Sequence, residues 1–332
     1  MNAGILRAIG HTPLVELTRF FTGDFRVYAK LELLNPGGSM KDRPAFRIIS
    51  AGMESGDITD ETVIIESSSG NMGIGLAQAC SYLGLKFICV VDPKTTTQNI
   101  RLLEAYGAQV DQVSEPDPLT GEYLQARLNR VQAILASTKN GFWPNQYSNV
   151  QNAAAHRQTM HEIISALDGE VDFVFCATST CGTLRGCAEY VREHQLTTRV
   201  IAVDAVGSVI FGGERGKRLI PGHGSAVRPQ LYQPDLASQC VKVTDLECVV
   251  GCRRLARLEA ILAGGSSGAV LMAMERFSTT LPRGATCVAI LSDRGERYLD
   301  TIYSDEWVEE HFGNVSNLWE GVKASHICMA AQ

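Results

Sequence analysis

The first feature capable of chemistry is a lysine at the start of a predicted helix. Lys41 follows a glycine-rich turn in residues 35–43, which read NPGGSMKDR. A lysine there lies beside the positive end of the helix dipole, which disfavours its ammonium form. An amine held partly neutral is what Schiff-base chemistry requires. A surface lysine at a helix start is the ordinary alternative.

Two further loops offer hydroxyl and backbone N–H groups at predicted helix starts. Residues 66–73, ESSSGNMG, follow a predicted strand and suit a carboxylate, with a plain helix cap as the alternative. Residues 178–183, TSTCGT, also follow a predicted strand and can bind a phosphate. Because this loop lacks both the G-K-[ST] ending of a Walker loop and the G-x-G-x-x-G spacing of dinucleotide folds, we expect a phosphate without a nucleotide.

A fourth loop places hydroxyl groups among very small residues. Residues 264–268, GGSSG, precede a predicted helix, so a plain helix entry is also possible. Taken together, two anion receptors and a lysine at a helix start are what a phosphorylated aldehyde cofactor and an amino-acid carboxylate require. The loops together predict this cofactor and substrate more strongly than any one loop does.

The elements that must position these loops alternate along the chain. Short apolar runs and longer helical patterns follow one another, which indicates an α/β fold with largely parallel sheets. In such sheets ligands bind beyond the carboxyl ends of the strands. Strands are predicted over 27–32, 63–66, 87–91, 173–177, 200–203 and 286–291, and helices over 41–55, 71–83, 153–167, 182–192, 244–258 and 267–277.

Composition narrows the class of protein. With 332 residues, 45% of them hydrophobic and 20% charged, the chain predicts a soluble globular protein of two domains. A net charge of -6 with scattered Lys and Arg leaves no basic stripe for nucleic acid. We expect no membrane segment and a cytoplasmic location, because no apolar run approaches roughly 18 residues and the N-terminus lacks the pattern of a secretory signal.

The ten cysteines predict neither disulfides nor a metal site. Cys80, Cys89, Cys176 and Cys287 lie in apolar stretches, where reduced, buried side chains are expected. Cys248 and Cys252 are one helical turn apart, but no nearby His or second Cys pair completes a zinc set.

In this order, NPGGSMKDR, SSSGNMG, STCGT and GGSSG resemble the motifs of the cysteine synthase and cystathionine β-synthase family of fold-type II pyridoxal-phosphate enzymes. The resemblance runs from about residue 9 to residue 303. It implies a tryptophan synthase β-like fold, with two three-layer α/β/α domains and pyridoxal 5'-phosphate in the cleft between them. The implied parts are a larger domain of residues 1–39 and 148–313, a smaller mobile substrate domain of residues 40–147, and a peripheral tail of residues 314–332.

The same resemblance implies roles for individual residues. Lys41 would carry the cofactor as a Schiff base, Asn71 would bond the ring hydroxyl, and Ser266 would face the pyridine nitrogen. Because a serine hydroxyl does not hold that nitrogen protonated, β-replacement is favoured over transamination. The implied phosphate loop is Ser179, Thr180, Cys181, Gly182 and Thr183, and the implied substrate-binding residues are Ser68, Ser69, Met72, Gln146, Tyr147 and Ser179.

Several positions depart from ordinary cysteine synthases. They resemble the branch that combines O-phospho-L-serine with the amine of L-glutamate to give N-(2-amino-2-carboxyethyl)-L-glutamate, the precursor of L-2,3-diaminopropionate in siderophores and some antibiotics. The product would pass to a separate oxidative enzyme. The departures are Pro44 after Arg43, Ser179 and Cys181 in place of glycines, Met72 in place of threonine, and the segments 145–147, 203–212 and 303–307.

The choice of nucleophile rests on the residues around the phosphate loop. Ser179 and Tyr147 can contact the carboxylates of a second substrate, with a helix-cap serine and a core tyrosine as the alternatives. Arg215, Lys217 and Arg218 are candidates for the leaving phosphate, with a solvated loop as the alternative. Two other functions remain open: a cysteine synthase that uses O-acetylserine or O-phosphoserine with sulfide, and a catalytically idle homologue that regulates a partner. The family resemblance further implies a homodimer.

Overall fold

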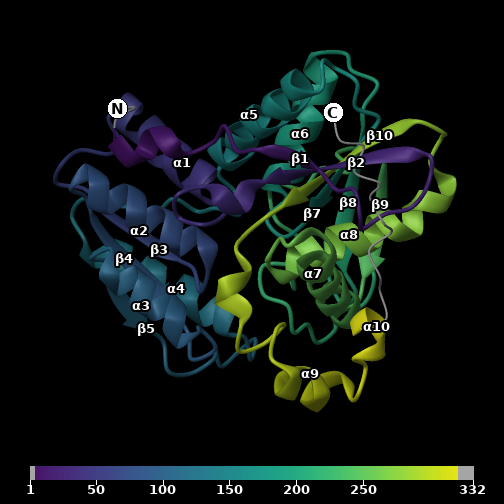
Figure 1. The fold of residues 1–332 in the computed structure, drawn as a ribbon. Helices are drawn as coiled ribbons and strands as arrows, with labels where there is room; N and C mark the ends of the chain where they lie inside the picture. The colour runs from purple at the N-terminus through teal and green to yellow at the C-terminus, as the bar shows by residue number, and fades with distance from the viewer. Residues whose placement is uncertain (1–3, 321–332) are drawn as a thin grey trace.

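The computed structural model describes residues 4–320 as an α/β fold built on two separate sheets (Figure 1). The larger sheet has the order β1-β2-β10-β7-β8-β9, and only β1 runs antiparallel to its neighbour. Its strands are β1 (Leu14–Glu16), β2 (Phe25–Leu31), β7 (Phe173–Ala177), β8 (Arg199–Ala205), β9 (Gln239–Val243) and β10 (Ala285–Leu291). The smaller sheet is fully parallel, in the order β5-β4-β3-β6. Its strands are β3 (Val63–Ser67), β4 (Lys86–Val91), β5 (Gln109–Gln112) and β6 (Gly141–Phe142).

Helices cover both faces of each sheet. The α-helices are α1 (Asp42–Ser55), α2 (Asn71–Leu83), α3 (Thr97–Ala105), α4 (Tyr123–Ser137), α5 (Val150–Ala166), α6 (Gly182–Glu193), α7 (Asp245–Glu259), α8 (Gly265–Phe277), α9 (Asp305–Phe312) and α10 (Asn317–Glu320). The short 3-10 helices are η1 (Gly4–Ala8), η2 (Glu32–Leu34), η3 (Ser278–Thr280) and η4 (Gly295–Tyr298). Helix α1 packs against both α2 and α5, so it joins the parts built on the two sheets (Figure 1).

The cores show why each sheet needs helices on both faces. Every residue of β10 is buried, which is typical of a parallel strand covered on both sides. One apolar core lies between the larger sheet and α7 and α8, and another lies on the opposite face against α5 and α6. The smaller sheet is covered by α1 and α2 on one face and by α4 on the other. The predicted α/β fold of three-layer units is confirmed.

Every predicted strand and helix is present, with ends displaced by at most three residues. The sequence analysis missed several elements because their apolar patterns are weak. Strand β5 reads QVDQ at a sheet edge, and β6 is only two residues long. Helix α4 buries only Val131 and Ile134, so its apolar stripe is narrow. The other missed elements are β1, β9, α3, α9 and α10.

The chain beyond residue 313 is described only in part. Trp319 is buried, and its ring lies 4.7 Å from the guanidinium carbon of Arg253. The rest of the predicted tail, residues 321–332, lies outside the described residues. In the part of the chain that is described, no helix has the length and apolar content to cross a bilayer. The predicted domain boundaries stay predictions.

Candidate active site

The candidate residues lie in loops at the carboxyl ends of parallel strands from both sheets. Lys41 follows β2 and η2, Asn71 follows β3, and Tyr147 follows β6. Residues 178–183 follow β7. Because strands in a parallel sheet end at the same edge, loops far apart in the sequence are brought together there.

Lys41 is fixed by the backbone on both sides of it. The N–H of Met40 donates to the carbonyl of Ser292 at 2.8 Å, and the N–H of Lys41 donates to Ser39 Oγ at 3.2 Å. Burial lowers the pKa of the Lys41 amine, while the Asp293 carboxylate acts in the opposite direction. The predicted direction of the shift is therefore confirmed. Its main cause is desolvation, whereas the sequence argument relied on the helix dipole.

Asp293 connects the two sheets at this point. It follows β10, and its Oδ2 accepts hydrogen bonds from Asn71 Nδ2 at 2.7 Å and from the Tyr298 hydroxyl at 2.5 Å. The Oδ1 of Asn71 accepts a hydrogen bond from Arg297, so the Asn71 amide is held in one orientation. The sequence analysis missed Asp293 and Arg297. The position of Asp293 just after a predicted buried strand is the signal that would have found it.

The phosphate loop forms a compact cradle in front of helix α6. Cys181 has a left-handed φ of 65°, and Gly182 opens the helix. Thr180 Oγ1 accepts hydrogen bonds from the N–H of Gly182 at 3.3 Å and from Asn152 Nδ2 at 3.2 Å. A Cβ at Gly182 would lie 2.1 Å from Asn152 Oδ1, so only glycine fits. Thr183 faces the Lys41 loop, with its hydroxyl 4.0 Å from the sulfur of Met40.

The cysteine in this loop is a packing residue. Cys181 is buried against Ile210 and Leu231, and burial raises the pKa of its thiol to about 12. It is therefore uncharged near neutral pH. Among the described residues the cysteines are free, and those predicted to be buried are buried; no group of His, Cys, Asp and Glu there could hold a metal ion.

The loop after β3 is held mainly by its own hydrogen bonds. Ser68 Oγ accepts from the N–H of Gly73 at 2.9 Å, and the carbonyl of Ser69 accepts from Asn99 Nδ2 at 3.0 Å. Met72 is buried in the apolar core of the smaller sheet. These contacts shape the loop at the start of α2. Contact between the loop residues and a substrate stays a prediction.

Glu66 joins this loop to the segment after β6. Its Oε1 accepts from the N–H of Ser67 at 2.8 Å and from Trp143 Nε1 at 3.0 Å, and its Oε2 accepts from the N–H of Gln146 at 3.2 Å. The carbonyl of Gln146 in turn accepts from Asn152 Nδ2 at 2.7 Å. Burial raises the pKa of Glu66 to about 7, although these hydrogen bonds oppose the rise. The sequence analysis placed Glu66 in this loop but gave it no role.

The charges of two arginines, Arg127 and Arg218, act on the Tyr147 phenol. Burial raises the pKa of the Tyr147 phenol, the charges of both arginines and contact with the Ser179 hydroxyl lower it, and the Glu66 carboxylate raises it. Arg127 comes from α4 and pairs with Asp92 at 3.1 Å. Two guanidinium groups therefore act on this phenol together with the Glu66 carboxylate, and guanidinium groups are suited to binding an anion.

Only one of the three cations predicted in residues 215–218 lies beside Tyr147. Arg218 is half-buried there. Arg215 is exposed and pairs with Glu122 at the start of α4, and Lys217 is exposed. Arg215 and Lys217 match the alternative of a solvated loop.

Ser266 lies in the first turn of α8 and is buried. Two glycines precede it, and a Cβ at Gly264 would lie 2.1 Å from Asp293 Oδ1. The close approach of this backbone to Asp293 brings the start of α8 to the same region as Asn71 and Lys41.

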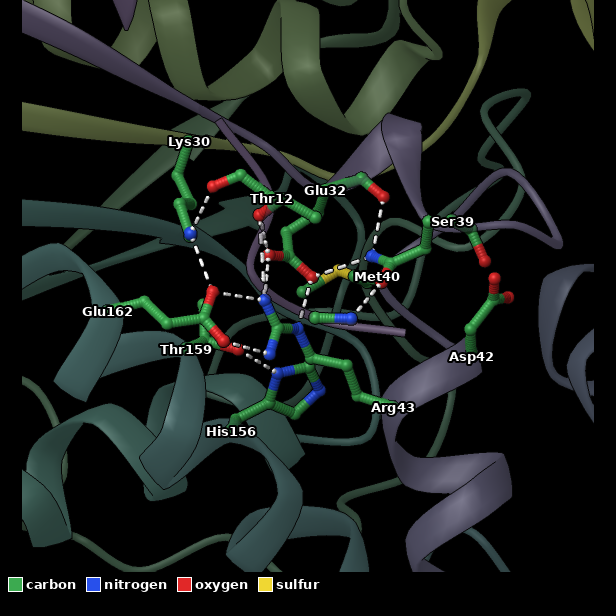
Figure 2. A network of polar contacts seen from close by, with 12 residues as sticks. Thr12, Lys30, Glu32, Ser39, Met40, Asp42, Arg43, His156, Thr159 and Glu162 are labelled. Carbon is green, nitrogen blue, oxygen red and sulfur yellow. Dashed lines mark hydrogen bonds and ion pairs between the residues drawn. The ribbon is translucent and has the colours of Figure 1, made fainter. Parts of the chain in front are cut away.

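A buried ion network ties α1 to the larger sheet (Figure 2). Arg43 donates two hydrogen bonds to the Glu32 carboxylate, both at 2.7 Å, and two to Glu162, at 2.8 and 2.7 Å. Lys30 Nζ donates to Glu162 Oε2 and to the carbonyl of Thr12, both at 2.6 Å. Because Arg43 is two residues from Lys41, the network fixes the start of α1.

The fold and this set of loops define a class of enzyme. Residues 5–293 match the model of the family described as "Pyridoxal-phosphate dependent enzyme", and the chain belongs to that family. Its cofactor is pyridoxal 5'-phosphate.

Several solved structures are similar over nearly the whole chain. The O-acetylserine dependent cystathionine β-synthase from Helicobacter pylori is 32% identical, with 90% of this chain and 98% of that chain covered and a TM-score of 0.83. The cysteine synthase from Entamoeba histolytica is 31% identical, with 91% of each chain covered and a TM-score of 0.84. An O-ureido-L-serine synthase is 30% identical, with 91% and 97% covered and a TM-score of 0.83.

The residues present fit pyridoxal 5'-phosphate. The turn at the start of α6, where Gly182 packs directly against Asn152, suits the phosphate. The amine of Lys41, with its lowered pKa, suits the aldehyde. Asn71 and Ser266 offer polar groups for the ring from the starts of α2 and α8. Which ring atoms they bond stays a prediction.

Proposed function

We propose that this protein catalyses a β-replacement in which the amine of L-glutamate displaces the phosphate of O-phospho-L-serine. The products would be N-(2-amino-2-carboxyethyl)-L-glutamate and phosphate. The departing phosphate takes up the proton that the amine releases. The single observation that carries this proposal is that the guanidinium groups of Arg127 and Arg218 both act by their charge on the buried Tyr147 phenol, with the Glu66 carboxylate opposing them. Phosphate and glutamate carboxylates are anions that such groups bind, whereas neither acetate loss nor sulfide addition needs both of them.

Each step of the proposed reaction uses side-chain or backbone groups of this chain. When bound, the cofactor withdraws electrons from the substrate and so labilises the α-proton and the β-substituent. Lys41, whose amine has a lowered pKa, removes the α-proton. The N–H groups at the start of α2 bind the substrate carboxylate, as the anion preference of a helix start predicts. Arg127 and Arg218 stabilise the charge that develops on the leaving phosphate.

The similar structures support β-carbon chemistry on amino acids without deciding the nucleophile. They are named as a cystathionine β-synthase, a cysteine synthase and an O-ureido-L-serine synthase, so relatives of this chain are named for different products. A cysteine synthase is therefore the alternative function. A catalytically idle homologue is disfavoured because Lys41 and the phosphate cradle are intact.

A product assay tests the proposal. Holoenzyme is incubated with O-phospho-L-serine or O-acetyl-L-serine, each with L-glutamate or sulfide, and the products are identified by mass. We expect the glutamate adduct from O-phospho-L-serine. Cysteine from the sulfide reactions, with no product from the glutamate reactions, would establish the cysteine synthase alternative, and no product from any of the four would favour the idle homologue.

Ser179→Gly is expected to weaken use of the second substrate more than cofactor binding. Loss of one hydroxyl contact should raise the KM for L-glutamate about fivefold, since a hydrogen bond contributes about 1 kcal/mol. Steady-state kinetics and cofactor content by absorbance measure the two effects. Ser179→Ala is the matched control because it removes the hydroxyl without adding backbone freedom. An equal loss of cofactor and of glutamate use would contradict the assigned role.

The proposal extends to the protein's oligomeric state, its location and the enzyme that takes up its product. We propose a homodimer in the cytoplasm and transfer of the product to a separate oxidative enzyme that releases L-2,3-diaminopropionate for siderophore or antibiotic synthesis. A secondary amine joining two amino-acid skeletons requires oxidation at the C–N bond to release the smaller amine, which supports the oxidative step. Sedimentation of the purified protein measures the oligomeric state.

A further inference from the structure

A buried histidine lies beside the charged groups around Tyr147. His223 is 1% exposed, and within residues 4–320 neither of its ring nitrogens has a hydrogen-bond partner. Its carbonyl accepts a hydrogen bond from Arg218 Nη1 at 3.1 Å. Buried polar groups are nearly always paired, so two unpaired nitrogens in one ring are unusual and leave the ring able to bond a ligand.

The backbone holds this histidine in a defined place. Gly222 and Gly224 on either side of it both have left-handed φ angles, of 73° and 70°. The N–H of Gly224 donates at 2.7 Å to the carbonyl of Thr178, which directly precedes the phosphate loop. A Cβ at Gly224 would lie 2.8 Å from the Cβ of Ala205, so a larger residue would force the turn away from the end of β8. The turn thus places His223 next to the loop that contains Ser179.

A chain of contacts then leads from His223 to the proposed second-substrate residues. Besides its bond to the His223 carbonyl, Arg218 carries a charge that lowers the pKa of both the His223 ring and the Tyr147 phenol, and the Ser179 hydroxyl also lowers the pKa of that phenol. The Nε of Arg218 is buried and, like the His223 ring, lacks a partner among the described residues. The guanidinium group is half-buried, so part of it stays accessible.

His223 can accept a hydrogen bond, whereas Arg218 can only donate. Burial, together with the charge of Arg218, lowers the pKa of His223 to about 4, so the ring is neutral near neutral pH. A neutral imidazole has one nitrogen that accepts a hydrogen bond and one that donates. Arg218 only donates. An acceptor next to a cation is complementary to an amine next to a carboxylate, which is the head group of an α-amino acid.

We propose that, once the phosphate has left, Arg218 and His223 bind the α-carboxylate and the α-amine of the incoming amino acid, and so select an amine nucleophile over sulfide. This inference rests on the proposed function, because it assumes that the nucleophile is an amino acid. An imidazole nitrogen that accepts one N–H of the neutral amine leaves the lone pair of that amine free to attack. Sulfide carries neither a carboxylate nor a second donor to match the pair.

Two substitutions at His223 test the inference in the holoenzyme. His223→Leu removes the acceptor, and His223→Gln keeps one in an amide. With saturating O-phospho-L-serine, we expect His223→Leu to raise the KM for L-glutamate on the order of tenfold, since a hydrogen bond to a polar head group of this kind contributes about 1.5 kcal/mol. His223→Gln should show a smaller rise. Phosphate release and the rate with sulfide should stay within about twofold of the unsubstituted protein, because neither uses this contact.

The matched control is Lys217→Ala, which removes an exposed cation from the same segment and should leave every rate unchanged. An unchanged KM for L-glutamate in His223→Leu would overturn the inference while leaving the proposed function intact. Equal losses with glutamate and with sulfide would also overturn it, by showing that His223 only supports the fold. If the unsubstituted enzyme used sulfide but no amino acid, the proposed function itself would fail and the inference with it.

Discussion

Lys41→Ala is expected to lower turnover about a thousandfold or more and to abolish covalent attachment of the cofactor. Loss of a positioned proton-transfer group alone lowers a rate by about 10²–10⁴-fold, and no neighbouring amine replaces the covalent link. The fold should survive, because the Lys41 side chain makes no capping hydrogen bond at the start of α1. Steady-state kinetics measures turnover, and intact mass after borohydride reduction measures covalent attachment.

Two variants separate the chemistry of Lys41 from its charge. Lys41→Arg keeps a cation but has no nucleophilic amine, so it should be as inactive as Lys41→Ala. Lys139→Ala removes an exposed lysine at the end of α4 and should retain full activity. Turnover of Lys41→Ala within tenfold of the unsubstituted enzyme, or a cofactor still linked to it after reduction, would contradict the role given to Lys41.

Glu162→Ala is expected to destabilise the protein by about 3–5 kcal/mol. Removing one partner of a buried ion pair leaves the remaining charge buried and unpaired. Such a change usually lowers the free energy of unfolding by about 3–5 kcal/mol. Here the substitution leaves Lys30, whose side chain is 2% exposed, without its carboxylate partner, while Arg43, at 4% exposed, keeps only Glu32 (Figure 2). Denaturant unfolding followed by circular dichroism measures the free energy of unfolding.

The matched control is an ion pair on the surface. Asp24 pairs with Arg283 at 2.8 Å, with side chains that are 62% and 92% exposed. Because solvent screens such pairs, Asp24→Ala should change stability by less than about 1 kcal/mol. If both substitutions had equally small effects, the buried network would contribute no more to the fold than a surface pair does.

The same network predicts a dependence of stability on acid. Burial alone would raise the pKa of Glu162, but hydrogen bonds and charge from Arg43 and a hydrogen bond from Lys30 outweigh it and lower the pKa to about 2. A carboxyl with a lowered pKa in the folded state contributes stability above its unfolded pKa. That contribution, about 3 kcal/mol, is lost as the pH falls from about 5 to about 2. The free energy of unfolding, measured across this pH range, should therefore fall less steeply in Glu162→Ala than in the unsubstituted protein.

The sequence by itself determined the parts of the site that depend on local pattern. Lys41, Asn71 and residues 178–183 each lie where a strand signal gives way to a helix signal, and these positions follow from glycine content and periodicity alone. The order of strands and helices indicated an α/β fold with parallel sheets for the same reason. A parallel sheet then implies that loops after its strands meet at one edge.

Tertiary structure decided which side chains meet in those loops. Asn71 and Asp293 are 222 residues apart in the sequence, and their contact depends on how the smaller sheet packs against the larger one. The meeting of Arg218 with Tyr147 and His223 likewise depends on the path of a long segment without regular structure after β8. Hydrophobic periodicity carries no information on such distant pairs.

The lysine at the start of α1 shows both contributions. Its place at a helix start after a glycine-rich turn was evident from the sequence, and so was the direction of its pKa shift. The main cause of that shift is burial, because the packing of both sheets around Lys41 removes water from its amine, and only the folded chain produces that desolvation.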